Sequence, residues 1–80
     1  MERSQIKKEI LNMLIERNAR ISPEEMSDNI DIRNDIDLDS IQILEIIGDI
    51  EDRFDIEIPD RKLRELKTVG NIITFIEENQ

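Results

Sequence analysis

Apolar residues recur every three or four positions in the first segment of the chain, residues 4–20. The residues that share this face are Ile6, Ile10, Met13 and Leu14. Charged residues occupy most of the other positions, so the pattern predicts an amphipathic helix. Ser22 and Pro23 then offer an N-cap and a proline at the first helical position, and they predict one short helical turn.

The same spacing returns in residues 40–54 and predicts a second helix. The residues expected on its buried face are Leu44, Ile47, Ile50 and Phe54, with Ile43 and Ile46 beside them. Asp39 is a favourable N-cap, and Gln42 follows it at the spacing of a capping box. Gly48 costs a helix interior about 1 kcal/mol relative to alanine, so we expect close packing or local flexibility at that position.

Residues 28–39 alternate between apolar and polar side chains, as a strand would. The apolar members of this segment are Ile30, Ile32, Ile36 and Leu38. A strand needs a partner strand, and no other segment of the sequence offers one. We therefore predict a long extended loop in this place.

The last part of the chain predicts two more helices. Residues 55–59 end the second helix in an extended conformation, because the residue before a proline disfavours the helical region. Asp60 is expected to cap a short third helix over residues 61–66, and Thr68 to cap the last helix. The buried stripe expected in that last helix is Val69, Ile72, Ile73 and Ile76. We predict one domain over residues 1–80 with an all-α fold, a small four-helix bundle with a long loop between the first two helices.

The composition excludes several kinds of chemistry. The chain has no cysteine and no histidine, which excludes disulfide bonds, thiol catalysis, Ser-His pairs and the usual zinc sites. We therefore expect no enzymatic activity. No apolar run approaches the roughly 18 residues that a membrane helix needs, and residues 1–5 lack the pattern of a signal peptide. These observations favour a soluble, cytoplasmic protein.

The net charge of −9 is unevenly distributed. Residues 24–60 hold 14 of the 20 acidic residues and two of the 11 basic ones. In the predicted second helix, Glu45, Asp49 and Asp52 recur at intervals that place them on one side, with Glu51 adjacent. Such a surface repels nucleic acid and anionic membranes, and it attracts basic protein surfaces.

Ser40 is the side chain best placed for chemistry. As the first residue of the second helix, it lies beside unpaired backbone N–H groups and the positive end of the helix dipole, where a phosphate is favoured. Its hydroxyl is therefore a candidate attachment point for a phosphate-linked group. The alternative is that Ser40 is only a polar residue in the first helical turn.

Several short stretches, at fixed spacing from one another, resemble the acyl carrier protein family. The matching positions are Asp39-Ser40-Ile41, Glu45, Glu51-Asp52, Phe54 with Ile58-Pro59-Asp60, and Thr68-Val69-Gly70. The stretch from the first to the last of these positions aligns without a gap, and the amphipathic first helix extends the resemblance over essentially the whole chain.

This resemblance implies a carrier function. A phosphopantetheinyl transferase would attach 4′-phosphopantetheine from coenzyme A to Ser40, and the arm would hold acyl intermediates of fatty-acid or polyketide-like biosynthesis as thioesters. Acyl-transfer and synthase enzymes with basic patches would dock on the second helix of a monomeric carrier. The docking residues implied are Ile41, Glu45, Asp49, Glu51 and Asp52. Two alternatives remain open: a carrier loaded with an aminoacyl or unusual acyl group, and an acidic helical interaction module without a prosthetic group.

The sequence also departs from the family pattern. Ile41 replaces a leucine, and Gln42 and Arg53 stand where acidic residues are common. The third-helix region is basic, through Arg61, Lys62, Arg64 and Lys67. We interpret this basic segment as charge balance against the second helix; the alternative is that it selects a different set of partners.

Two pairs of carboxylates could in principle offer oxygens to a divalent cation. They are Asp35 with Asp39, and Glu51 with Asp55. Neither pair belongs to anything that resembles an EF-hand loop, so we predict no metal site.

Overall fold

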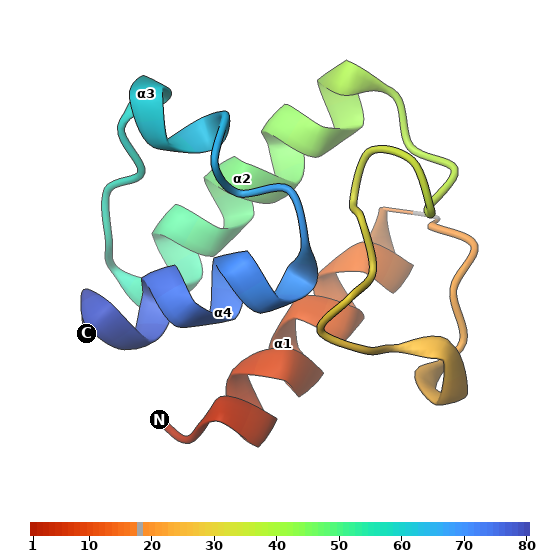
Figure 1. The fold of residues 1–80 in the computed structure, drawn as a ribbon, viewed down its shortest axis with the longest axis horizontal. Helices are drawn as coiled ribbons and strands as arrows, with labels where there is room; N and C mark the ends of the chain where they lie inside the picture. The colour runs from red at the N-terminus through yellow and green to blue at the C-terminus, as the bar shows by residue number, and fades with distance from the viewer. Residues whose placement is uncertain (18) are drawn as a thin grey trace.

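The computed structural model describes residues 1–17 and 19–80. In chain order it contains α1 (Arg3–Glu16), a 3₁₀ turn η1 (Pro23–Glu25), α2 (Ser40–Phe54), α3 (Asp60–Leu63) and α4 (Val69–Glu78) (Figure 1). The predicted all-α fold, with a short third helix and a long loop before α2, is confirmed. The short turn at Pro23 also forms where it was predicted.

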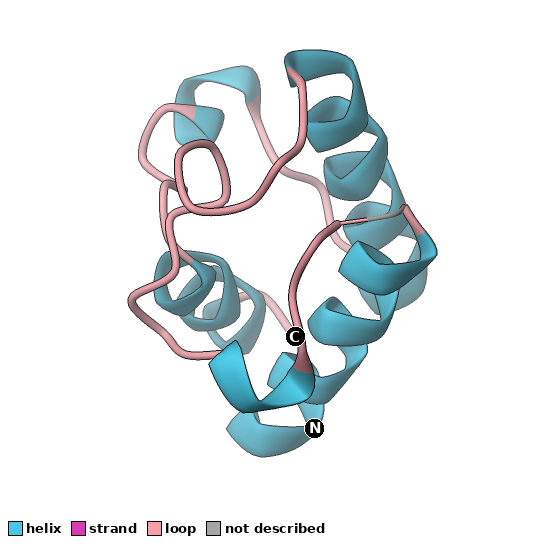
Figure 2. Ribbon diagram, turned by 90° about the vertical axis from the view of Figure 1, so that its right-hand side faces the viewer, coloured by secondary structure: helices cyan, strands magenta, loops and turns pink. Residues whose placement is uncertain are grey.

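α1 packs against both α2 and α4 and runs roughly antiparallel to each of them (Figures 1 and 2). The Met1 amino group donates a 3.0 Å hydrogen bond to Oε1 of Gln80, so the two ends of the described chain lie side by side. Within the described residues, every helix is too short or too polar to cross a membrane.

The core consists of aliphatic side chains from α1, α2, α4 and the loops between them. The least exposed are Ile6, Ile10, Leu14, Ile50, Val69, Ile72, Ile73 and Ile76. The stripes predicted for the first and last helices are therefore confirmed, and Met13 is also buried. In the part of the chain that the structure describes, no polar or charged residue is buried in this core.

α1 ends at Glu16, earlier than the predicted end at residue 20. The Ala19 N–H donates a 2.9 Å hydrogen bond back to the Leu14 carbonyl oxygen. Leu14 is the last fully buried residue of the helix, Ile15 is already 44% exposed, and beyond the helix end Ala19 packs at the edge of the core. Position 18, which the predicted helix included, lies outside the described residues.

The segment between η1 and α2 is a long loop, as predicted, but it is not extended throughout: residues 32–35 form a turn, in which the Asp35 N–H donates a 2.9 Å hydrogen bond to the Asp31 carbonyl oxygen. The expectation that this segment has no partner was also wrong. Asp31 forms an isolated antiparallel bridge with Thr68. Beside it, the Ile32 N–H donates to the Lys67 carbonyl oxygen at 3.0 Å, and the Val69 N–H donates to that of Ile30 at 2.9 Å. These bonds tie the loop to the segment that leads into α4.

α3 differs from its predicted bounds at both ends. Pro59 is the N-cap and Asp60 is the first helical residue, so Asp60 does not cap the helix as predicted. The helix ends at Leu63 rather than at residue 66. A reason is visible just beyond it: Leu66 enters the core, and the Lys67 carbonyl pairs with the long loop, which requires an extended backbone.

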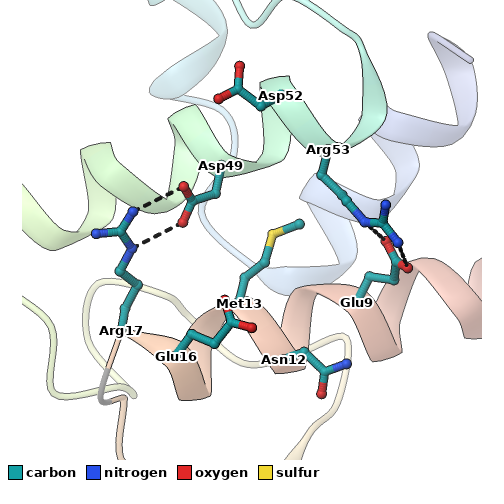
Figure 3. A pocket seen from close by; sticks show the side chains of 8 residues that line it. All are labelled: Glu9, Asn12, Met13, Glu16, Arg17, Asp49, Asp52 and Arg53. Atoms are coloured by element: carbon teal, nitrogen blue, oxygen red, sulfur yellow. Dashed lines mark hydrogen bonds and ion pairs between the residues drawn. The ribbon is translucent and has the colours of Figure 1, made fainter.

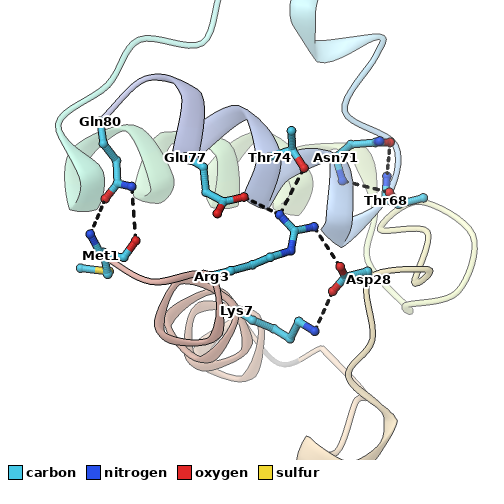
Figure 4. Close-up of polar contacts among 9 residues, drawn as sticks. All are labelled: Met1, Arg3, Lys7, Asp28, Thr68, Asn71, Thr74, Glu77 and Gln80. Carbon is cyan, nitrogen blue, oxygen red and sulfur yellow. Dashed lines mark hydrogen bonds and ion pairs between the residues drawn. The ribbon is translucent and has the colours of Figure 1, made fainter.

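The cap predicted for α4 is confirmed. Thr68 Oγ1 accepts a 3.1 Å hydrogen bond from the Asn71 N–H, and Asn71 Oδ1 accepts one of 3.2 Å from the Thr68 N–H (Figure 4). This reciprocal pair satisfies N–H groups that the start of the helix would otherwise leave without an acceptor.

Candidate functional site

Ser40 is the first residue of α2 and is exposed. The first hydrogen bond of helical type at this end is donated by the Ile43 N–H to the Asp39 carbonyl oxygen, at 3.0 Å. The Ser40 hydroxyl makes no hydrogen bond with any described residue. The geometry therefore leaves this hydroxyl free at the positive end of the α2 dipole.

The start of α2 is held by the capping box that the sequence predicts. Asp39 Oδ1 accepts a 2.8 Å hydrogen bond from the Gln42 N–H, and Gln42 Oε1 accepts one of 3.0 Å from the Asp39 N–H. Gln42 Nε2 also donates to the Arg17 carbonyl oxygen at 3.2 Å. Gln42 thus joins the start of α2, where Ser40 lies, to the end of α1.

Two apolar side chains are exposed next to Ser40. Ile41 is 69% exposed and Leu44 is 60% exposed. The prediction that Leu44 faces the core was wrong. The buried face of α2 is formed by Ile46, Ile47 and Ile50, with Ile43 packed beside them. Since successive helical residues are about 100° apart, the residue after Ile43 points away from that face.

Arg17 joins the end of α1 to two of the carboxylates predicted to dock partners, Asp49 and Glu45. Figure 3 shows the pair with Asp49. The Nε and Nη2 atoms of Arg17 donate to the two carboxylate oxygens of Asp49, each at 3.0 Å. Its Nη1 atom donates to Oε2 of Glu45 at 2.9 Å. The hydrogen bonds to Asp49 raise the pKa of the Arg17 guanidinium, so its charge is kept.

The other two predicted docking carboxylates differ from each other. Glu51 is half-buried, and its Oε2 accepts a 2.8 Å hydrogen bond from the Ile58 N–H, so it stabilises the loop that leads to α3. Asp52 is exposed and forms no ion pair with a described residue. The predicted exposure is therefore right for Glu45 and Asp52, whereas Asp49 and Glu51 are half-buried.

The ion pairs of α2 with other elements run to Arg17 and Glu9 of the α1 segment, and the basic third-helix segment, which we interpreted as charge balance for α2, makes none with it among the described residues. Arg53 pairs through Nε and Nη2 with Glu9 of α1, as Figure 3 shows. Lys62 pairs with Glu65, and no ion pair among the described residues joins Arg61, Arg64 or Lys67 to α2. The charged residues at the α1–α2 boundary line a groove of about 670 Å³.

Sequence analysis missed Arg17 as a contributor to this site. Position 17 follows Met13 at helical spacing, which is the signal that places it on the α2-facing side of α1. Its partners, however, are 28 and 32 residues away along the chain.

Three of the four carboxylates considered for a divalent cation accept hydrogen bonds from the backbone. Asp35 Oδ2 accepts a 2.8 Å hydrogen bond from the Asp31 N–H, Asp39 caps α2, and Glu51 is bonded to the Ile58 N–H. Within residues 1–17 and 19–80, acidic side chains form no group of three or more that could hold a metal ion.

Comparisons with known proteins agree with this geometry. The family model described as a phosphopantetheine attachment site matches residues 9–76. The acyl carrier protein of Lactobacillus acidophilus is 37% identical over 67 residues, which cover 84% of this chain and 84% of the relative. That of Lactobacillus johnsonii is 35% identical over 80 residues, which cover 100% of this chain and 99% of the relative. The solved structure of the acyl carrier protein from Enterococcus faecalis matches with a TM-score of 0.84 at 28% identity, over 100% of both chains.

Proposed function

The chain belongs to the acyl carrier protein family, and we propose that its residues 1–80 form a single carrier domain that bears 4′-phosphopantetheine on Ser40. In this proposal the protein carries acyl intermediates of fatty-acid or polyketide-like biosynthesis and catalyses no reaction itself. The loaded group is presented to acyl-transfer and synthase enzymes one after another.

The observation that carries the proposal is the exposed, unbonded hydroxyl of Ser40 at the start of α2. A phosphodiester at this atom would lie beside the N–H groups of the first helical turn, where the helix dipole favours negative charge. The Gln42 N–H is bound by the Asp39 carboxylate, and the first helical hydrogen bond is donated by the Ile43 N–H. The N–H groups of Ser40 and Ile41 precede that bond, so they are the ones left for a phosphate. The start of α2 therefore fits a phosphopantetheine group attached to Ser40.

When attached, the arm supplies a terminal thiol that binds the acyl group as a thioester. The protein's own residues do the rest. Asp39 and Gln42 hold the α2 start rigid, so that a transferase meets the hydroxyl in one orientation. Ile41 and Leu44 offer apolar contact area beside it, and the carboxylates of α2 steer basic enzymes towards this end of the molecule.

Intact-mass measurement tests the proposal directly. The protein is incubated with coenzyme A and a phosphopantetheinyl transferase of broad specificity, and we expect a single addition. Ser40→Ala should abolish the addition, while Ser22→Ala and Ser27→Ala, which change other serines, should leave it complete. Labelling of Ser4, Ser22 or Ser27 would contradict the proposal. No labelling by several such transferases would favour the acidic interaction module instead.

A further inference from the structure

Arg17 occupies the first two carboxylates that follow Ser40 along α2, namely Glu45 and Asp49. It engages them with three hydrogen bonds of 2.9 to 3.0 Å. A basic group of a docking enzyme would have to reach the same oxygens. Part of the acidic surface proposed to attract partners is therefore already neutralised by the protein itself.

This ion pair can be displaced. The side chains of Arg17 and Asp49 are each 34% exposed and that of Glu45 is 47% exposed, so water and salt screen the attraction. The Arg17 backbone has a separate anchor, because its carbonyl oxygen accepts from Gln42 Nε2. The guanidinium can consequently leave the carboxylates while the end of α1 stays attached to α2.

We propose that Arg17 is a specificity-determining residue that competes with the basic groups of partner enzymes for Glu45 and Asp49. This inference rests on the proposed carrier function and adds a condition on the partner. An enzyme that presents one isolated lysine gains little binding free energy from these carboxylates, because Arg17 already binds both. An enzyme that places an arginine or two basic side chains over both carboxylates can displace Arg17 and dock. Arg17 thus raises the charge complementarity that docking requires.

Arg17→Gln should free both carboxylates while adding only one unit of negative charge. The probe is a phosphopantetheinyl transferase with a basic docking surface, and the readout is kcat/KM for modification of Ser40. We expect a rise of roughly two- to five-fold at low ionic strength, the range that one surface ion pair spans. We also expect a steeper fall of kcat/KM with added sodium chloride, since more unpaired charge then takes part in docking.

Arg3→Gln is the matched control. Arg3 also lies on α1 and also binds two carboxylates, those of Asp28 and Glu77 (Figure 4). Its side chain is 39% exposed, close to the value for Arg17. The control removes the same charge and the same kind of ion pair without touching Glu45 or Asp49. We expect its kcat/KM to stay near that of the unchanged protein.

The outcomes separate this inference from the carrier proposal. A wild-type protein that is never modified overturns both. A wild-type protein that is modified normally, with Arg17→Gln no faster than Arg3→Gln, overturns the inference alone, and so does a slower Arg17→Gln. Far-UV circular dichroism and thermal melts check that each variant is folded. If Arg17→Gln is unstable, Arg17→Lys keeps the charge but loses the two-pronged bond to Asp49; a rate no higher than wild type then counts against the inference.

Discussion

The Gly70 N–H donates a 2.9 Å hydrogen bond to the Asp28 carbonyl oxygen, and a Cβ on Gly70 would lie 3.0 Å from that same oxygen. The carboxylate of Asp28 is also bound by Arg3 and Lys7 of α1, as Figure 4 shows. The loop at Asp28 is therefore clamped between α1 and the start of α4, and glycine is the residue that lets its backbone approach.

The two glycines of the chain should respond oppositely to alanine. At Gly70 the added methyl group meets backbone that is held on both sides, so we expect a loss of about 1–3 kcal/mol in unfolding free energy, as in overpacking. At Gly48 a Cβ would meet none of the described atoms within 4 Å. Gly48→Ala should therefore gain about 1 kcal/mol, or roughly 4–8 °C in Tm. Calorimetric melts of both variants measure these changes. An increase of Tm in both variants would mean that the backbone at Asp28 shifts at little cost to make room for the methyl group.

Leu44 and Ile47 give a second matched pair on α2. Leu44 is 60% exposed and Ile47 is 6% exposed. Leu44→Ala should change the unfolding free energy by no more than about 0.5 kcal/mol, whereas Ile47→Ala should cost about 2–5 kcal/mol. Urea denaturation measures both values. In addition, Leu44→Ala should slow modification of Ser40, because the apolar contact beside it is lost. A large loss of stability in Leu44→Ala would mean that Leu44 is buried in the core and not exposed.

Asp28 should contribute to the dependence of stability on pH. Hydrogen bonds from Lys7 and Arg3 lower the pKa of its carboxyl in the folded protein. A group with a lowered folded-state pKa stabilises the fold fully above its unfolded pKa, about 3.9 for aspartate, and loses this effect as the pH falls through the folded value. We therefore expect Asp28→Asn to be less stable than wild type near neutral pH, with the difference shrinking in acid. Urea melts between neutral and strongly acidic pH measure this; a difference that does not vary with pH would argue against the ion pairs.

Added salt should stabilise the fold, because residues 24–60 hold 14 carboxylates and like charges repel one another. Screening acts over about 10 Å at 0.1 M salt, a length comparable to the spacing of neighbouring carboxylates on α2. Tm should rise with sodium chloride, and magnesium chloride should achieve the same rise at lower concentration. Arg17→Gln should show a larger rise than wild type, since it frees Glu45 and Asp49. No rise with either salt would mean that the intramolecular pairs already balance the acidic segment.

Local sequence determined where α2 and α4 begin. Asp39 with Gln42, and Thr68 with Asn71, satisfy the first N–H groups of each helix from positions only three residues apart, so their spacing alone predicts the caps. The exposed position of Ser40 follows from the cap that precedes it. The buried stripes of α1 and α4 are also legible in the sequence, because their apolar residues recur at helical spacing.

Only the tertiary structure decided which face of α2 is buried and which basic residue pairs with its carboxylates. Leu44 lies at the edge of the apolar face of α2, where the sequence pattern does not decide between core and solvent; packing against α1 left it outside. The Arg17 contacts with Glu45 and Asp49, and the approach of Asp28 to Gly70, join segments far apart along the chain. Such contacts depend on distances that exist only after the helices pack, and the spacing of residues within one segment carries no information about them.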